Sequence, residues 1–246
     1  MKTQQAQCRA QSGTSVKITS ILLALLGAGG SVQATSVNLL GDPGFDLQPL
    51  QSDITVLSDF AGQNGKWGTE VGTIVTGTSS DFVTPDSASS MLSMTNADGG
   101  VTTQTFQVID LSQLSLSAYA SAITAGTATF DLHALFTTGK GYSGASAAVV
   151  AMFYTAANYS SHNTPYQLSA GKILDADANT WETVSLTGTI PANSTWMAVQ
   201  VLYGDSSLAT GQPGYVDSAS LTIAPEPSSY ALLGLSAGAL LVRRRR

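Results

Sequence analysis

The stretch Phe-Asp-Leu-His-Ala-Leu-Phe-Thr, residues 130–137, decides the fold class of this 246-residue chain. Its apolar residues Phe130, Leu132, Ala134 and Phe136 occupy every second position, and mostly polar residues lie between them. Successive side chains of a β-strand point to opposite faces of the sheet. The alternation therefore predicts a strand that buries one face in a core and exposes the other.

Similar patterns recur between residues 35 and 224, and no segment there keeps the 3.6-residue spacing of an amphipathic helix. The Ala-rich run 143–157 is the one place where a helix competes, and Val149, Val150 and Phe153 favour a strand there. Turns rich in Gly, Pro and Asn separate the segments. The strands that we predict are 91–95, 101–111, 114–121, 130–137, 147–154, 183–189, 196–203 and 215–223.

These strands predict an all-β domain, an antiparallel two-sheet β-sandwich of the jelly-roll type, over residues 35–224. All 3 Trp and all 7 Phe residues of the chain lie in this segment. Disordered segments are poor in aromatic residues, so the abundance of Gly and Ser does not indicate low complexity here. A segment of this length is sufficient for one domain with a real core.

Charge is unevenly distributed along the chain. Residues 1–34 contain Lys2, Arg9 and Lys17 and no acid, whereas residues 35–224 contain 15 acids and only three lysines. Nucleic-acid binding needs clustered cations in the folded part, so we expect no nucleic-acid partner. The single cysteine, Cys8, lies near the N-terminus, which leaves the predicted domain without a disulfide or a cysteine-ligated metal.

The N-terminus has the pattern of a secretory signal peptide. An apolar run, residues 18–27, follows the basic leader and precedes Val32-Gln33-Ala34, whose small residues fit a signal-peptidase site. A buried N-terminal helix is the alternative, but three cations and no acids precede the run. We therefore predict that residues 1–34 are a signal peptide, cleaved by signal peptidase after Ala34.

The C-terminus combines a proline motif, an apolar run over residues 230–242 and a block of arginines. In this order the three parts resemble the PEP-CTERM sorting signal of Gram-negative bacteria, here over residues 225–246. The resemblance implies a membrane protease of the exosortase type, an inner-membrane intermediate, and delivery to the cell envelope or the exopolysaccharide matrix. The residues that carry the resemblance are Pro225, Glu226, Pro227, Arg243, Arg244, Arg245 and Arg246.

The apolar part of this signal predicts a short transmembrane helix. Residues 228–242 would span about 22 Å as a helix, against a hydrocarbon core of about 30 Å. The arginines would stay on the cytoplasmic side and hold the domain outside. An ordinary tail anchor preceded by a linker is the alternative interpretation.

A second resemblance concerns the central domain. The opening 38–46 (Asn-Leu-Leu-Gly-Asp-Pro-Gly-Phe-Asp), the run from Trp181 to Leu186 and the closing 214–221 resemble the corresponding strands of jelly-roll carbohydrate-binding modules, the galactose-binding-like sandwich. These pieces stand in the family's order and span most of residues 38–223. The resemblance implies the sandwich fold and contact with polysaccharide.

The same resemblance implies a structural calcium ion that joins the first strand to the last. The matching positions are Gly44, Asp46 and Asp217, and Ser218 stands where a second aspartate is frequent. Calcium takes six to eight oxygen ligands, which two carboxylates with carbonyls and waters supply. The alternative is that both aspartates are solvated acids at strand ends.

A separate pattern, Asp175-x-Asp177-x-Asn179, begins like a calcium loop. Thr180 stands where that loop requires Gly, and Leu186 stands where it requires Glu. We therefore predict Asx-type turns ahead of Trp181 rather than a metal site.

Sugar binding requires aromatic rings with amide or carboxylate groups nearby. Trp67, Tyr142, Tyr159 and Tyr166 lie in predicted loops or strand ends with such neighbours and are the candidates. In a β-sandwich a Trp or Tyr is more often part of the packing, with its polar tip hydrogen bonded.

No catalytic group stands out in the domain. The run 141–145 (Gly-Tyr-Ser-Gly-Ala) approaches the nucleophile elbow of α/β hydrolases, but that elbow requires a strand-to-helix turn. His133 is predicted to face outward beside Asp131. We therefore expect a secreted, non-enzymatic envelope or matrix protein that contacts carbohydrate. The alternatives are a structural or adhesive surface protein without sugar binding and a secreted hydrolase that uses Ser143 or Glu182.

Overall fold

The computed structural model describes residues 37–47, 50, 60–69, 72–95, 102–112, 117–142, 144–156, 166–204 and 212–225. The predicted signal peptide 1–34, residues 226–246 of the sorting signal and the sugar candidate Tyr159 lie outside these residues. Those predictions therefore stay predictions.

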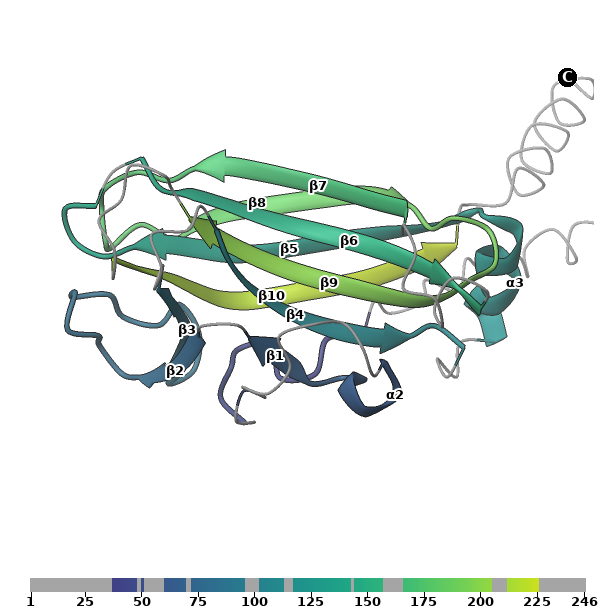
Figure 1. Cartoon of the computed structure of the whole chain (residues 1–246), viewed down its shortest axis with the longest axis horizontal. Coiled ribbons are helices and arrows are strands. Elements are labelled where there is room, and N and C mark those ends of the chain that lie inside the picture. Colours follow the sequence, from purple (N-terminus) through teal and green to yellow (C-terminus); the bar gives the residue numbers. More distant parts are fainter. Residues whose placement is uncertain are drawn as a thin grey trace, which may run out of the picture. The chain divides into compact units, whose positions relative to one another are not determined.

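The domain is a sandwich of two five-stranded sheets in which all strand pairs are antiparallel, as predicted (Figure 1). The order in one sheet is β1 (Trp67–Thr69), β4 (Thr103–Asp110), β9 (Ser194–Gly204), β6 (Ser146–Thr155) and β7 (Tyr166–Ile173). The order in the other is β2 (Gly72–Thr76), β3 (Ser90–Thr95), β10 (Pro213–Pro225), β5 (Ala128–Thr138) and β8 (Glu182–Thr189).

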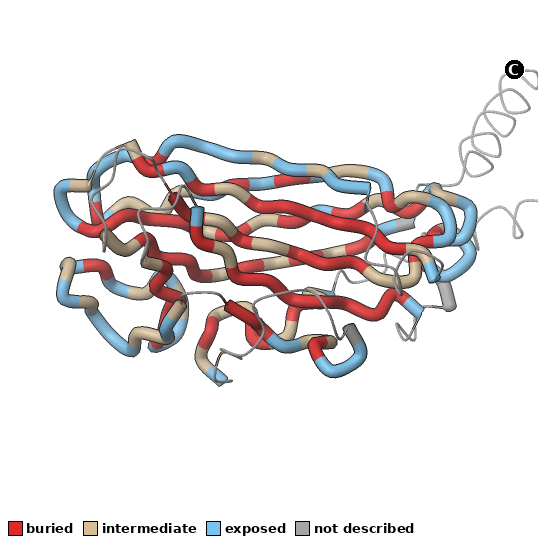
Figure 2. The backbone as a smooth tube through the Cα atoms, in the orientation of Figure 1, coloured by how far each residue is buried: buried red, intermediate tan, exposed pale blue. Residues whose placement is uncertain are grey.

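The core lies between the two sheets, and β5 shows how the sequence builds it. The side chains of Phe130, Leu132, Ala134 and Phe136 are all buried, whereas Asp131 is exposed. Buried stretches of the chain run along the strands, and exposed stretches gather at the loops (Figure 2). From the facing sheet, the Phe153 ring of β6 lies 5.4 Å from the Phe130 ring. The predicted alternation in residues 130–137 is confirmed, and burial of this apolar face is the main driving force for the sandwich.

The predicted strand 114–121 is wrong, because residues Ser117–Ala125 form the helix α3. Tyr119 and Ile123 are four residues apart, which places both on the face that packs into the core. Gly126 ends the helix at φ 69°, and the amides of Gly126 and Thr127 donate to Ile123 and Ala122. This is a Schellman cap, which glycine adopts without steric cost. The alternating Ser and Ala residues fit either period, so tertiary packing decided the outcome.

Three strands were not predicted: β1, β2 and β7. β1 has three residues and β2 five, which is too short for a period to be recognised. β7 did carry a signal, because Tyr166, Leu168 and Ala170 stand at every second position. A second short helix, α2, covers Phe60–Gln63. Within the described ranges, no helix has the length and apolar character needed to cross a membrane.

Candidate functional site

The first described segment is held against the last strand by its own side-chain amide. Asn38 donates from Nδ2 to the Ala219 carbonyl (2.9 Å), and its Oδ1 accepts from the Leu221 amide (2.9 Å). The Ala219 amide donates to the Pro43 carbonyl (2.9 Å). β10 has a register shift between Asp217 and Ser220. Asp217 thus lies at the irregular part of β10, where the first described segment meets this last strand. We call this place the junction.

Asp217 is fully buried at this junction. Its carboxylate accepts hydrogen bonds from the amides of Ser87 (2.8 Å) and Ser218 (2.6 Å) and from the Ser87 hydroxyl (3.1 Å). Burial raises the pKa of Asp217 above its usual range, and these hydrogen bonds act in the opposite direction. The carboxylate is thus held in place by neutral donors, and no cationic side chain among the described residues forms an ion pair with it.

The three residues of the predicted calcium site converge at this place. A Cβ atom added to Gly44 would lie 3.0 Å from Asp46 Oδ2, 3.5 Å from Ser87 Oγ and 3.8 Å from Asp217 Oδ1. Two carboxylates and a hydroxyl therefore surround the space that the missing side chain of Gly44 leaves open. The other oxygen of Asp46 accepts from the amide and hydroxyl of Ser89, each at 3.2 Å.

The donor set at the junction consists of oxygen atoms. Among the described residues no three His, Cys, Asp or Glu side chains are grouped as a metal site. An ion here would therefore take two carboxylates together with hydroxyl, carbonyl and water oxygens, which suits calcium and not zinc. Sequence analysis did not identify the contribution of Ser87, because serines in a loop carry no distinguishing pattern.

A second candidate site lies where three loops meet: β2–β3, β5–β6 and β7–β8. Phe82 is 66% exposed there and has a positive φ of 66°. The Lys140 ammonium lies 5.1 Å from the centre of its ring. The adjoining hollow has a volume of about 720 Å³ and is lined by Phe82, Lys140, Gly141, Ala176, Asp177, Ala178 and Asn179.

A local network holds the Phe82 loop in this conformation. Ser79 Oγ accepts from the amides of Asp81 and Val83, both at 3.2 Å, and the Phe82 amide donates to the Ser79 carbonyl (3.1 Å). The Asp81 carboxylate accepts from the Tyr215 hydroxyl at 2.7 Å. Burial and the negative charge of Asp81 raise the pKa of Tyr215, so this hydroxyl keeps its proton.

The wall of the hollow contains the turns predicted over residues 175–179. Asp175 Oδ1 accepts from the Asp177 amide (2.9 Å), and Asp177 Oδ1 accepts from the Asn179 amide (3.0 Å) and side chain (2.9 Å). These are Asx turns, as predicted. The Asn179 donors lower the pKa of Asp177, so its carboxylate is charged beside the hollow at neutral pH.

The predicted sugar-binding residues do not form one site. Trp67 is a correction: its ring is 3% exposed, lies 5.1 Å from the Phe45 ring, and donates from Nε1 to the Asp42 carbonyl (3.0 Å). A ring buried in this way offers no face to a sugar. Tyr142 is half-buried near the Phe82 loop, with its hydroxyl 3.4 Å from Asp81. Tyr166 is 54% exposed at the opposite end of β6, where it pairs with Phe153.

Phe82 itself was missed by sequence analysis. The surrounding Ser-Ser-Asp-Phe-Val-Thr sequence has no periodic pattern, and nothing in it shows that the ring points to solvent. The available signal was a large aromatic residue within a polar, proline-containing loop.

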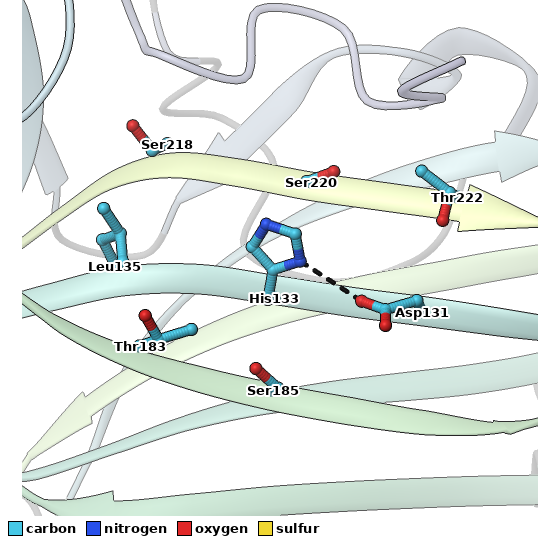
Figure 3. Close-up of a pocket in the computed structure, with 8 residues that line it drawn as sticks. All are labelled: Asp131, His133, Leu135, Thr183, Ser185, Ser218, Ser220 and Thr222. Carbon is cyan, nitrogen blue, oxygen red and sulfur yellow. Dashed lines mark hydrogen bonds and ion pairs between the residues drawn. The ribbon is translucent and has the colours of Figure 1, made fainter. Parts of the chain in front are cut away.

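A third hollow, of about 630 Å³, lies on the outer face of β10, β5 and β8 (Figure 3). His133 Nδ1 lies 3.2 Å from Asp131 Oδ1, and both side chains point outward, as predicted. Ser220 and Ser185 stand opposite His133 on the neighbouring strands. The side chains of the pair are 39% and 52% exposed, so water competes for their interaction. This face presents hydroxyls and the hydrogen-bonded pair of His133 and Asp131, with no Phe, Tyr or Trp among its lining residues.

No protein-family profile and no curated protein match this chain. Among solved structures, TmCBM61 in complex with beta-1,4-galactotriose is 13% identical with a TM-score of 0.44, covering 78% of this chain and 100% of that one. The Stig cyclase Fisc from Fischerella sp. TAU is 12% identical with a TM-score of 0.47, covering 78% and 99%. A CBM22-1-CBM22-2 tandem domain from Paenibacillus barcinonensis is 14% identical with a TM-score of 0.46, covering 68% and 49%.

At these identities and TM-scores, the likenesses assign neither a ligand nor an activity to this chain. Its own strand order and pairing place it among the antiparallel two-sheet β-sandwich proteins.

Proposed function

We propose that this protein is a non-enzymatic, exported component of the cell envelope or exopolysaccharide matrix, and that it contacts carbohydrate at the hollow beside Phe82. The observation that supports the site is the combination at Phe82 of 66% exposure and a positive φ. A bulky residue in the left-handed region costs about 1–3 kcal/mol, and such strain clusters at ligand-binding sites. Folding alone does not repay this cost, because the ring is largely left in water.

The chemistry of the hollow suits a sugar. The apolar ring of Phe82 offers a face for the C–H groups of a pyranose, and a flat aromatic ring loses little side-chain entropy on binding. Asp177 and Asn179 bring an acceptor and an amide to the same hollow, and Lys140 adds a donor. A few polar groups beside an apolar surface are the usual composition of a small-ligand site.

The test is a glycan array with the purified full chain, followed by calorimetric titration of the best ligand. Phe82→Ala is expected to weaken binding at least tenfold, equivalent to about 1.4 kcal/mol. Tyr166→Ala is the matched control, because it removes an exposed aromatic ring at the other end of β6. Equal loss in both variants, or retained affinity in Phe82→Ala, would contradict the proposed site.

The non-enzymatic part of the proposal rests on the surroundings of the candidate catalytic groups. His133 and Asp131 lie in the middle of β5, whose backbone amides pair with β8 and β10 on either side. Amides used in the ladder are not free to stabilise an oxyanion. The loop between β5 and β6 joins two strands, rather than a strand to a helix. The candidate Ser143 lies outside the described residues. Hydrolysis of a glycan or ester by the purified chain, lost in His133→Ala, would overturn this part.

Export and sorting are proposed from the two terminal sequence patterns. β10 ends at Pro225, so removing residues 226–246 leaves the described strands intact. We expect that a chain truncated after Pro225 is released from the cell, whereas the intact chain stays cell-associated. An unchanged cell-associated fraction, measured by immunoblotting, would contradict a sorting role for the C-terminus.

We also propose that calcium binds at the junction of Gly44, Asp46, Ser87 and Asp217. The support is the buried carboxylate of Asp217, whose hydrogen-bond donors in the described part of the chain are neutral, and the space beside Gly44 that a Cβ would fill. An ion there would supply positive charge between two carboxylates and tie the first described segment to the last strand. Its role would be structural.

A further inference from the structure

β7 and β8 are the terminal strands of the two sheets, and both lie on the same side of the sandwich (Figure 1). The terminal strands at the other side, β1 and β2, have three and five residues. β7 and β8 have eight residues each. An edge strand of that length presents a row of backbone donors and acceptors to which another strand can add.

The backbone groups of β7 that point away from β6 can be identified from one hydrogen bond. The Leu174 amide donates to the Ala145 carbonyl (2.8 Å), in register with the pairing of Ser146 and Ile173. Hydrogen-bonded and non-hydrogen-bonded pairs alternate in an antiparallel ladder. The outward-pointing groups therefore belong to four residues, all exposed: Gln167, Ser169, Gly171 and Ile173.

The same argument applies to β8. The Ile190 amide donates to the Ala128 carbonyl (2.8 Å), and this pair continues the register of Thr129 with Thr189. The alternation then directs the backbone groups of four exposed residues toward the free edge: Thr183, Ser185, Thr187 and Thr189. Among the described residues, one side of the sandwich thus has two neighbouring edge strands to which no further strand is paired.

Two of the usual devices that block such edges, a proline and a bulge, are missing from β7. Its pairing with β6 is regular over eight residues without a bulge, and it contains no proline. Its one charged residue, Lys172, forms an ion pair with Glu182 of β8. A copy of the same edge therefore meets no unpaired like charge. Natural proteins protect long edges with proline, bulges or charged side chains. The one charge on β7 is already paired within the chain.

A single twofold axis fits both edges. Lys172 contacts Glu182, and a Cβ on Gly188 would lie 2.7 Å from the Leu168 side chain. The midpoint of β7, at Ala170, therefore lies opposite the midpoint of β8, at Ser185. An axis just outside these two points, midway between the two copies, would pair β7 with β7 and β8 with β8 of a second copy, and would match outward-pointing residues in each pair. Such an isologous arrangement is the commonest form of dimer.

We propose that the β7–β8 side is a homodimer interface, in which two copies of this chain join edge to edge and extend both sheets. The pairing of β7 with its copy is antiparallel and centred on Ala170, so that Ser169 bonds Gly171 and Gln167 bonds Ile173. The Phe82 loop lies outside these strands and stays available in both copies. The proposal does not depend on carbohydrate binding.

The first test is sedimentation equilibrium of the full chain with two variants at one position. Ser169→Pro removes an outward amide without touching a hydrogen bond to β6, which is where proline is tolerated in sheets. It is expected to raise the dimer dissociation constant at least tenfold, a change of about 1.4 kcal/mol. Ser169→Ala keeps the amide and should dimerise normally. Circular dichroism checks that both variants are folded.

The second test determines the register of the β7–β7 pairing by disulfide cross-linking, in a chain in which Cys8 is replaced (Cys8→Ser). Ala170→Cys should form a disulfide-linked dimer on mild oxidation, because residues facing each other in a non-hydrogen-bonded antiparallel pair are about 4.5 Å apart at Cα. Ser169→Cys should cross-link less. A wild-type chain that stays monomeric at about 1 mM, a very weak affinity, would overturn the proposal. So would dimers that Ser169→Pro leaves unchanged, because another surface would then form them.

Discussion

Phe45 and Phe82 have the same side chain and the same unusual backbone but opposite surroundings. Phe45 has φ 58° and Phe82 has φ 66°. The Phe45 ring is fully buried and lies 5.1 Å from Trp67, whereas the Phe82 ring is 66% exposed. Burying a phenylalanine side chain contributes about 1.5–3 kcal/mol, which offsets the strain at Phe45. No comparable burial offsets the strain at Phe82.

The difference shows that backbone strain has two different roles in this molecule. At Phe45 a strained turn directs an aromatic ring into the core beside the Asp217 junction, so the strain serves folding. At Phe82 the hydrogen bonds of Ser79, and the bond between Asp81 and Tyr215, hold a ring outward against solvent. Preorganisation of this kind lowers the entropy that a binding site loses when its ligand arrives.

The comparison is tested most strongly by removing each ring in turn. Phe45→Ala is expected to reduce the free energy of unfolding by about 3–5 kcal/mol, because it leaves a cavity in the core. Phe82→Ala should change it by less than about 1 kcal/mol, since only an exposed cation–π contact with Lys140 is lost. Urea unfolding followed by circular dichroism measures both. Similar losses in the two variants would show that Phe82, like Phe45, is a structural residue.

The next largest effect concerns the junction beside Phe45. If calcium binds the native state alone, it should stabilise the domain by about 2.7 kcal/mol at a hundredfold excess over Kd. Asp217→Asn removes one of the two carboxylates and should abolish most of this gain. Differential scanning calorimetry with calcium and with chelator measures it. Equal Tm values in both conditions for the wild-type chain would eliminate the ion site.

The junction also predicts a pH dependence with a definite sign. The pKa of Asp217 is raised in the folded state, so the metal-free domain gains from this group at low pH and loses that gain as pH rises through the folded pKa. Calcium binds the charged form and should compensate the loss. The calcium-induced rise in Tm is therefore expected at neutral pH and should vanish in acid. A rise that is independent of pH would assign the ion to another place.

The smallest expected effect tests whether the hydrogen bond between Tyr215 and Asp81, which holds the Phe82 loop, is needed for glycan binding. Tyr215→Phe removes the hydroxyl that holds Asp81 and should cost about 1.5 kcal/mol, the lower end for a hydrogen bond to a charged group, because this bond is only partly buried. It should also weaken glycan binding although Phe82 is unchanged. Tyr119→Phe, in α3, is the control. Unweakened binding in Tyr215→Phe would show that the loop needs no such support.

Whether the sequence predicted a structural feature depends on how close together in the chain the residues are that determine it. The core strand β5 was predicted because alternation over eight residues reports burial directly. The turns at Asp175–Asn179 were predicted because Asx turns form between neighbouring residues. α3 was not, since its Ser and Ala residues permit both periods and the packing of Tyr119 and Ile123 decides between them. Trp67 was misplaced for a similar reason, because its burial depends on Phe45 and Asp42, over twenty residues away.

The amino-acid sequence alone determined the all-β class, most strand positions and the pairing of Gly44 and Asp46 with Asp217 as one candidate site. These follow from periodicity and from a resemblance carried by short motifs. Only the tertiary structure decided that Trp67 is buried, that Ser87 completes the junction, that Phe82 faces solvent and that β7 and β8 are the edge strands of the described sheets. The physical reason is that exposure, strain and edge position are properties of contacts between distant segments, and no local pattern of residues encodes them.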